Sequence, residues 1–229
     1  MSKRQAILIG ATGLVGQSLL KQLIDSQHYT QIISVSRRPI VDDSAEVQQL
    51  IVEDFAQLGS RLLDIDLRHA DAFSTLGTTQ KQAGSKARFI EVDHGYNLSF
   101  ATACKAAGAA HFLLLSATGA NPKSRIFYNR VKGDLERDIA ALAFARLSVF
   151  QPSLLMGQHQ DSRLGEGLAQ RAFQLVKPIV PDTWDYRPIE AARVAAAMAH
   201  IATSPIAAID SPHCYSNRAM LELTLEPQP

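Results

Sequence analysis

Tyr128 and Lys132 form the residue pair in this chain whose types and spacing best suit acid–base chemistry. Residues four positions apart lie on one face of a helix, so the two side chains are expected to face the same site. A phenol with a pKa of about 10 transfers protons poorly at neutral pH, whereas a neighbouring ammonium stabilises the phenolate and lowers that pKa. The pair therefore predicts a helix-borne proton carrier, Tyr128, assisted by Lys132.

Ser116 ends the apolar, strand-like run of residues 111–116, upstream of this pair. In a parallel sheet, the carboxyl end of such a central strand opens onto the ligand-binding edge, where a hydroxyl can orient a substrate carbonyl. The alternative is a strand-terminating hydroxyl bonded to local backbone. Ser116 is thus a candidate third member of the reactive group.

A strand-like run, residues 6–9, leads directly into a glycine-spaced turn and then into a helical pattern. In this arrangement the first glycine permits a tight turn, the second lets backbone approach a pyrophosphate, and the third lets the helix pack on the strand. The helix start adds free N–H groups and a positive dipole end. The alternative is a purely structural turn. The candidate cofactor-binding residues are Gly10, Ala11, Thr12, Gly13, Leu14, Val15 and Gly16.

Ser36-Arg37-Arg38 follows the second strand, where NAD-binding units carry an acidic residue about 20 residues beyond the glycines. Two guanidiniums there leave the ribose diol of NAD without its acceptor, yet can hold a 2′-phosphate by charge-assisted hydrogen bonds. NADP(H) is therefore the predicted cofactor, the alternative being a solvated strand end. Asp54 is a candidate for the adenine amino group or, equally, a helix N-cap.

Strand-like and helical patterns alternate along the chain, which is typical of a parallel sheet covered by helices on both faces. The sequence predicts an α/β fold, a doubly wound sheet of the Rossmann type, with ligands bound at the carboxyl ends of its strands. We expect one domain, 1–229, with 152–190 and 204–229 as a substrate-side lobe. Expected strands are 6–9, 31–36, 47–52, 70–76, 111–116, 146–150 and 214–216, and expected helices are 14–26, 93–107, 127–143, 162–176 and 190–201.

The composition narrows the class of partner. A net charge of +1 with scattered basic residues predicts neither a nucleic-acid nor an anionic membrane partner, so a small molecule is expected. The seven histidines and two cysteines lack metal-ligand spacing, so no metal is predicted, and Cys104 and Cys214 are interpreted as buried thiols. The short apolar run after Met1-Ser2-Lys3-Arg4-Gln5 predicts no signal or membrane segment, and a cytoplasmic protein is expected. The Ala-rich helices at 97–110 and 191–199 suit close helix contacts within one subunit or in a homo-oligomer.

Taken together, the glycine-rich turn, Ser116 and the Tyr-x-x-x-Lys pair resemble the short-chain dehydrogenase/reductase superfamily. Finer motifs resemble its atypical branch, which contains the Tat-interacting-protein oxidoreductases. They are Leu76-Gly77-Thr78-Thr79, Val92-Asp93, His111-Phe112-Leu113-Leu114-Leu115-Ser116, Tyr128 with Val131-Lys132-Gly133, and Val149-Phe150-Gln151-Pro152.

This resemblance implies NADPH held by the glycine turn and by residues from four further segments. They are Arg37, Arg38, Leu76, Gly77, Thr78, Pro152, Ser153, Leu154, Leu155 and Arg163. It also implies that Tyr128 donates a proton and that Lys132 binds the nicotinamide ribose. Where many relatives carry a Ser-Ser pair, this chain has Ser116-Ala117-Thr118, so the working hydroxyl is Ser116, Thr118 or neither.

Two functions follow from these observations. The first is an NADPH-dependent oxidoreductase that transfers hydride to or from a small carbonyl or alcohol substrate. The second is a regulatory protein that binds NADPH and senses redox state without turnover, because a cofactor site alone does not guarantee catalysis. Trp184, Tyr186 and Arg187, in a proline-rich loop, either face a substrate or pack under the C-terminal segment.

Overall fold

The computed structural model describes residues 4–40, 42, 44–157, 186–204 and 212–224. Its centre is a seven-stranded sheet of order β3-β2-β1-β4-β5-β6-β9 in which every pairing is parallel. The strands are β1 (Arg4–Ile9), β2 (Tyr29–Ser36), β3 (Val47–Ile51), β4 (Ala70–Ser74), β5 (His111–Leu115), β6 (Arg146–Gln151) and β9 (His213–Ser216). The order reverses between β1 and β4, so the predicted doubly wound sheet is confirmed.

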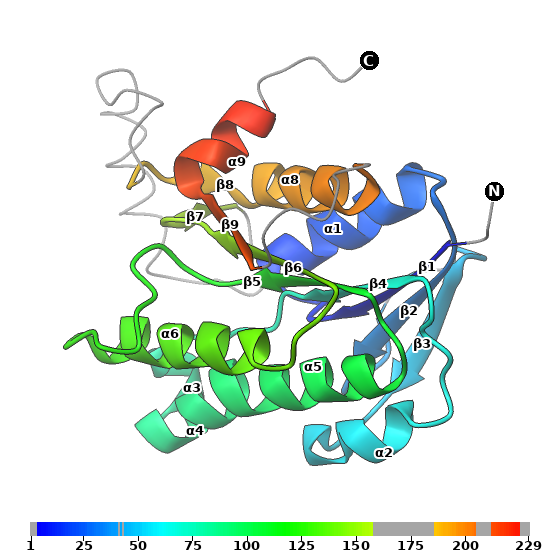
Figure 1. The fold of residues 1–229 in the computed structure, drawn as a ribbon, viewed down its shortest axis with the longest axis horizontal. Helices are drawn as coiled ribbons and strands as arrows, with labels where there is room; N and C mark the ends of the chain where they lie inside the picture. Colours follow the sequence, from blue (N-terminus) through cyan, green and yellow to red (C-terminus); the bar gives the residue numbers. More distant parts are fainter. Residues whose placement is uncertain (1–3, 41, 43, 158–185, 205–211, 225–229) are drawn as a thin grey trace.

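Helices cover both faces of this sheet (Figure 1). One face carries α1 (Leu14–Asp25), α8 (Ala191–Thr203) and α9 (Asn217–Leu223). The other carries α2 (Leu58–Leu62), α3 (Gln80–Ala83), α4 (Lys86–Ile90), α5 (Asn97–Ala106) and α6 (Phe127–Ala140). A short 3-10 helix, Phe55–Gln57, precedes α2. None of the helices in the described residues is long and apolar enough to cross a membrane.

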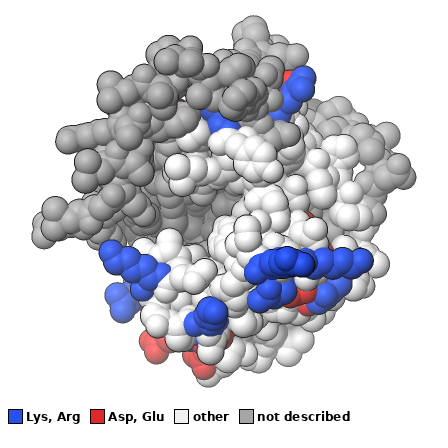
Figure 2. Space-filling model, turned by 90° about the vertical axis from the view of Figure 1, so that its left-hand side faces the viewer, with Lys and Arg blue, Asp and Glu red and all other residues white. Residues whose placement is uncertain are grey.

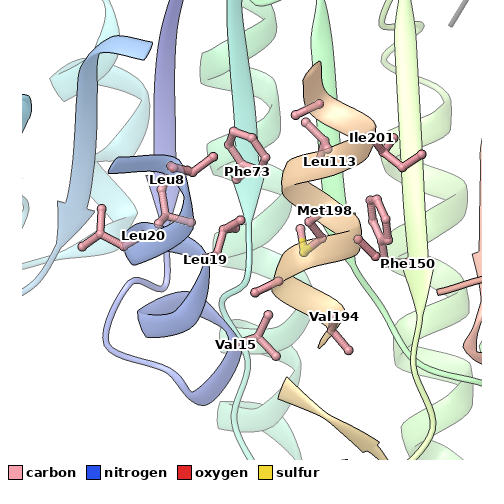
Figure 3. Close-up of a cluster of buried hydrophobic side chains, with 14 of the residues drawn as sticks. Leu8, Val15, Leu19, Leu20, Phe73, Leu113, Phe150, Val194, Met198 and Ile201 are labelled. Atoms are coloured by element: carbon pink, nitrogen blue, oxygen red, sulfur yellow. The ribbon is translucent and has the colours of Figure 1, made fainter. Parts of the chain in front are cut away.

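Two apolar cores form because the strands are buried on both faces and alternate their side chains between them. On one side Leu8, Phe73 and Phe150 meet α1 and α8, as Figure 3 shows. On the other, Ile7, Phe112 and Val149 belong to the core shared with α5 and α6. The sheet is thereby held rigidly between helices, and its carboxyl edge is left to carry the loops.

The helix predicted over 93–107 is longer and less regular than the sequence indicated. It begins at Lys86, where Ser85 caps the first turn by accepting a hydrogen bond from the Arg88 N–H at 3.1 Å. A π-helical turn, Glu91–Tyr96, then joins α4 to α5. Such turns insert one extra residue per turn and change which side chains face inward. Here the wide turn places Asp93 inside the protein, at 1% exposure.

The C-terminal part divides between the sheet and a small second ribbon. β9 pairs with β6 as the predicted last strand, and β7 (Leu155–Met156) pairs with β8 (Ile189–Glu190) beside it. Much of the expected substrate-side lobe, including the predicted helix 162–176 and Trp184, lies outside the described residues. Cys104 is buried as predicted, but Cys214 is exposed because β9 forms the sheet edge, so that prediction is wrong.

Candidate active site

The predicted site residues converge on the edge where β1, β4, β5 and β6 end. Gly10 follows β1, Gly77 lies just beyond β4, Ser116 directly follows β5, and Pro152 directly follows β6. Tyr128 enters from the first turn of α6. In Figure 2 the molecule is viewed from this side, and lysine and arginine side chains gather in groups over it. The topology therefore brings together groups that lie far apart in the sequence.

The glycine turn is packed so closely that side chains are excluded. Gly10 has a φ of +90°, and a Cβ there would lie 2.6 Å from the Leu76 backbone nitrogen. A Cβ on Gly16 would lie 2.0 Å from the Gly10 carbonyl oxygen. The first turn of α1 has no side-chain cap and no acidic residue, so its N–H groups and dipole remain available to an anion. This cradle fits a dinucleotide pyrophosphate.

Arg37 and Arg38 are exposed at the end of β2, and the Arg37 guanidinium lies 5.8 Å from the centre of the Phe55 ring. Contact with an aromatic face orients the planar guanidinium without consuming its donors. Asp54, by contrast, caps the 3-10 helix by accepting the Ala56 N–H at 3.0 Å. The structure thus favours the capping interpretation of Asp54.

Lys132 is buried beside Asp93. The spacing of Tyr128 and Lys132 in the sequence gave no sign of this partner. Lys132 is 4% exposed and Asp93 is 1% exposed. The Lys132 Nζ lies 2.9 Å from an Asp93 carboxylate oxygen. Burial lowers the pKa of Lys132, but the negative charges of Asp93, Tyr128 and Glu136 outweigh burial and raise it above its ordinary value. The raised pKa favours the charged form of Lys132, on the face of α6 that also carries Tyr128.

Asp93 also links this cation to loop 76–78. Its second carboxylate oxygen accepts the Thr78 N–H at 2.8 Å, and Gly77 packs directly over the ion pair. Asn97 supports the same turn by donating to the carbonyl oxygens of Leu76 and Asp93, each at 3.2 Å. Loop 76–78, predicted to contact the cofactor, is thus positioned by side chains from the π-helical turn and the start of α5.

Ser116 donates its hydroxyl proton to Glu136, which lies one turn beyond Lys132 on α6. The Gln151 amide donates to both oxygens of that carboxylate, at 3.0 and 3.1 Å. Burial raises the pKa of Glu136, although these hydrogen bonds and the charge of Lys132 oppose the rise. Ser116 is therefore bonded to a side chain rather than to local backbone, and its hydroxyl proton is directed to the Glu136 carboxyl group instead of toward a substrate carbonyl.

Thr118, the other candidate hydroxyl, donates to the Gln151 carbonyl oxygen at 2.8 Å. Sequence reasoning missed Glu136, although the pattern Tyr-x-x-x-Lys-x-x-x-Glu, which continues the same helical face, was available to find it. Asp93 was recognisable in the sequence only as part of the Val92-Asp93 motif. Neither partner could be assigned before the packing of the helices was known.

The segment after β6 returns to the glycine turn. Pro152 is buried, its carbonyl oxygen accepts the Thr118 N–H at 2.8 Å, and Leu155 is half-buried in β7. A Cβ on Gly157 would lie 2.7 Å from the Leu14 side chain, so this segment reaches the start of α1. Arg163 lies outside the described residues.

Comparison with known proteins gives three consistent results. The model of the NAD dependent epimerase/dehydratase family matches residues 6–129. Protein FMP52 of Debaryomyces hansenii is 37% identical over 210 residues, covering 90% of this chain and 91% of that protein. Protein HTATIP2 of Rattus norvegicus is 35% identical over 187 residues, covering 80% and 74%.

Solved structures share the fold at low sequence identity. A short-chain dehydrogenase/reductase from Burkholderia thailandensis superposes with a TM-score of 0.68 at 16% identity, covering 99% of each chain. MoeE5 in complex with UDP-glucuronic acid and NAD gives a TM-score of 0.66 at 16% identity, covering 92% of this chain and 74% of that one. At this identity the likeness shows the fold.

The expected cytoplasmic location is contradicted by these relatives. The FMP52 proteins of Debaryomyces hansenii, Candida glabrata and Scheffersomyces stipitis are described as mitochondrial. The expectation rested on the short apolar run near the N-terminus, and that feature was insufficient to assign a compartment.

Proposed function

Because this chain belongs to the NAD-dependent epimerase/dehydratase family, as an atypical short-chain dehydrogenase/reductase, we propose that it is an NADPH-dependent oxidoreductase acting on a small carbonyl or alcohol. One observation carries the proposal. Tyr128 lies one turn from a buried Lys132 that Asp93 holds in an ion pair, and Lys132 approaches Gly77 in the loop that also contacts Gly10 of the glycine cradle. This is the arrangement that a tyrosine proton carrier requires.

In this proposal one group of residues binds the cofactor and another transfers the proton. Gly10 to Gly16 and loop 76–78 hold the dinucleotide, which when bound supplies or accepts a hydride at its nicotinamide. In the reductive direction Tyr128 would donate its phenolic proton to the carbonyl oxygen of the substrate, and the phenolate would then recover a proton from water. Lys132 stabilises the phenolate through its positive charge and binds the nicotinamide ribose.

A Tyr128→Phe variant tests the chemical step. NADPH oxidation is followed in a single turnover with a panel of aldehydes and ketones, for the wild type and the variant. The variant is expected to bind NADPH and to lose hydride transfer, because the carbonyl oxygen no longer receives its proton. Full activity in the variant would eliminate this mechanism.

The choice of NADP(H) rests on Arg37 and Arg38, which are both exposed after β2, with the Arg37 guanidinium held against the Phe55 ring. An Arg37→Ala variant is expected to weaken NADPH binding by about 1.5–3 kcal/mol, because a charge-assisted hydrogen bond is lost, and to leave NADH binding unchanged. Titration of both cofactors against both proteins measures this. Equal affinities throughout would refute the phosphate clamp.

A second candidate is a redox-sensing protein that binds NADPH without turnover. It is favoured by the bonding of the two candidate hydroxyls, because Ser116 donates to Glu136 and Thr118 donates to the Gln151 backbone. Pull-down of protein partners at controlled NADPH occupancy tests this candidate. Partner binding that does not vary with NADPH occupancy would remove it.

A further inference from the structure

Basic residues are concentrated in the two segments that follow β4 and β5. Segments 77–90 and 116–130 together contain six lysines and arginines and no aspartate or glutamate, whereas the whole chain has 23 basic and 22 acidic residues. Arg88 alone among the six is paired, with Glu91 at 2.6 Å. Within the part of the chain that the structure describes, the other five form no ion pair with a carboxylate. We name Lys81, Lys86, Lys123, Arg125 and Arg130 the basic rim.

Four members of the basic rim belong to the surroundings of the start of α6, where Tyr128 lies: Lys123 and Arg125 precede this helix, and Lys86 and Arg130 lie against the Phe127 ring in its first turn. The Lys86 ammonium and the Arg130 guanidinium lie 5.3 and 6.0 Å from the centre of the Phe127 ring. The Phe89 ring contacts both Phe127, at 5.6 Å, and Tyr128, at 5.9 Å. Packing therefore connects the cations to the phenol. Figure 2 shows lysines and arginines gathered over this side of the molecule.

The loop before α6 is held in place by the rim itself. Arg130 donates to the Ser124 carbonyl oxygen at 3.0 Å, and Asn121 accepts the Lys123 N–H through its side chain at 2.8 Å. Lys123 and Arg125 are exposed on this ordered loop. Cations on fixed backbone attract an anion with less loss of conformational entropy than cations on a flexible tail.

The cofactor phosphates do not explain this charge. A pyrophosphate belongs at the Gly10 to Gly16 turn after β1, and a 2′-phosphate belongs at Arg37 and Arg38 after β2. The basic rim instead follows β4 and β5, on the opposite side of the point where the strand order reverses. The charge is thus available to a second ligand, the molecule that reaches Tyr128.

We propose that the basic rim selects substrates that carry a negatively charged group, a carboxylate or a phosphate, in addition to the carbonyl or alcohol that reacts. The inference rests on the proposed function, because it assigns Tyr128 as the point of reaction. A single cation at the surface contributes little to the binding free energy of an anion, but five cations of like sign raise the local concentration of an anion. They would bind the charged group of the substrate and leave its carbonyl or alcohol to reach Tyr128.

Two aldehydes of matched shape test the proposal: 4-formylbenzoate, which carries a carboxylate, and its neutral methyl ester. Binding to the protein, with and without NADPH, is measured by saturation-transfer NMR, and turnover is measured separately by NADPH absorbance. The carboxylate is expected to bind about fivefold more tightly than the ester, and the preference is expected to fall in high salt.

Charge removal shows whether the rim causes this preference. The double variant Lys86→Gln/Arg130→Gln is expected to remove the preference, and Lys123→Gln/Arg125→Gln, on the exposed loop, provides the same test should the first pair disturb folding. The matched control is Lys21→Gln/Arg137→Gln, which removes two exposed, carboxylate-paired cations outside the two loops. This control is expected to keep the preference.

The outcomes separate this inference from the proposed reaction. Preferential binding of the carboxylate without turnover supports the rim and counts against reduction of this aldehyde. Equal binding of the two aldehydes, including the case in which neither binds, overturns the rim as a substrate site. Rim-dependent binding to phosphatidylserine vesicles with equal binding of both aldehydes would also overturn it, and would assign the cations to a membrane surface.

Discussion

Replacing Asp93 by asparagine should expose how strongly the buried Lys132 depends on its partner. Lys132 and Asp93 lie 2.9 Å apart and are almost fully buried. The Asp93→Asn substitution preserves shape but leaves an ammonium without its counter-charge. Removal of one partner from a buried ion pair costs about 3–5 kcal/mol, out of a total stability of about 5–15 kcal/mol for a typical domain. The variant should therefore unfold at clearly lower denaturant concentration.

The pH dependence gives this prediction a definite sign. In the wild type the pKa of Lys132 is raised, so the contribution of the pair is present at all pH values below about 10.4 and is lost only as the pH rises through the raised pKa. In the variant, burial dominates and lowers the pKa of Lys132. The unfolded state then binds the extra proton, so the variant regains stability, by up to about 1.4 kcal/mol per pH unit, as the pH rises above the lowered pKa.

Urea denaturation followed by circular dichroism between pH 6 and about 9.5 measures both effects. The control is Asp134→Asn, which breaks an exposed pair with Arg137 on the same helix and is expected to change stability little. In Asp93→Asn/Lys132→Met the unpaired charge is gone, and most of the lost stability should return. An Asp93→Asn protein as stable as the control, with no gain toward high pH, would refute the account of Lys132 as a buried, partner-dependent cation.

Two further predictions concern Glu136 and Gly16. Because the pKa of Glu136 is raised by burial, the wild type should lose stability as the pH rises from about 4.5 through that pKa, and Glu136→Gln should lack this loss in urea denaturation across the same range. Identical pH profiles would show that Glu136 titrates as in the unfolded chain. Gly16→Ala would place a Cβ 2.0 Å from the Gly10 carbonyl oxygen, so it should lower thermal stability and abolish NADPH binding in a fluorescence titration, whereas Gly59→Ala, with open space around it, should do neither. Unchanged NADPH affinity in Gly16→Ala would contradict the close-packed cradle.

Several functional features could be predicted because they depend on local sequence. The strand, glycine turn and helix at residues 6–25 form one continuous unit. Such a unit can be predicted from the sequence because its backbone conformation depends on steric contacts between residues that are close in the chain. The shared face of Tyr128 and Lys132 follows from the helical repeat alone. The parallel sheet follows from alternating patterns, because a crossover helix must return each strand to the same direction.

Other features depend on packing between distant segments and could not be predicted. His111, to which the sequence assigned no hydrogen-bond partner, is buried between the Asp71 carboxylate at 3.2 Å and the Ser148 hydroxyl at 3.0 Å. Three strands supply this group, and its members meet only because β4, β5 and β6 are neighbours in register. The exposure of Cys214 likewise depends on β9 being the last strand of the sheet.

The sequence alone determined the fold class, the tight glycine turn after β1 and the helical face shared by Tyr128 and Lys132, because these depend on nearest neighbours and helical periodicity. Tertiary structure decided how those residues are charged and bonded. It paired Lys132 with Asp93, directed the Ser116 hydroxyl to Glu136, and brought Lys86 and Arg130 against the Phe127 ring at the start of α6. The physical reason is that burial and electrostatic interaction act through space, between groups whose separation along the chain carries no information about their distance.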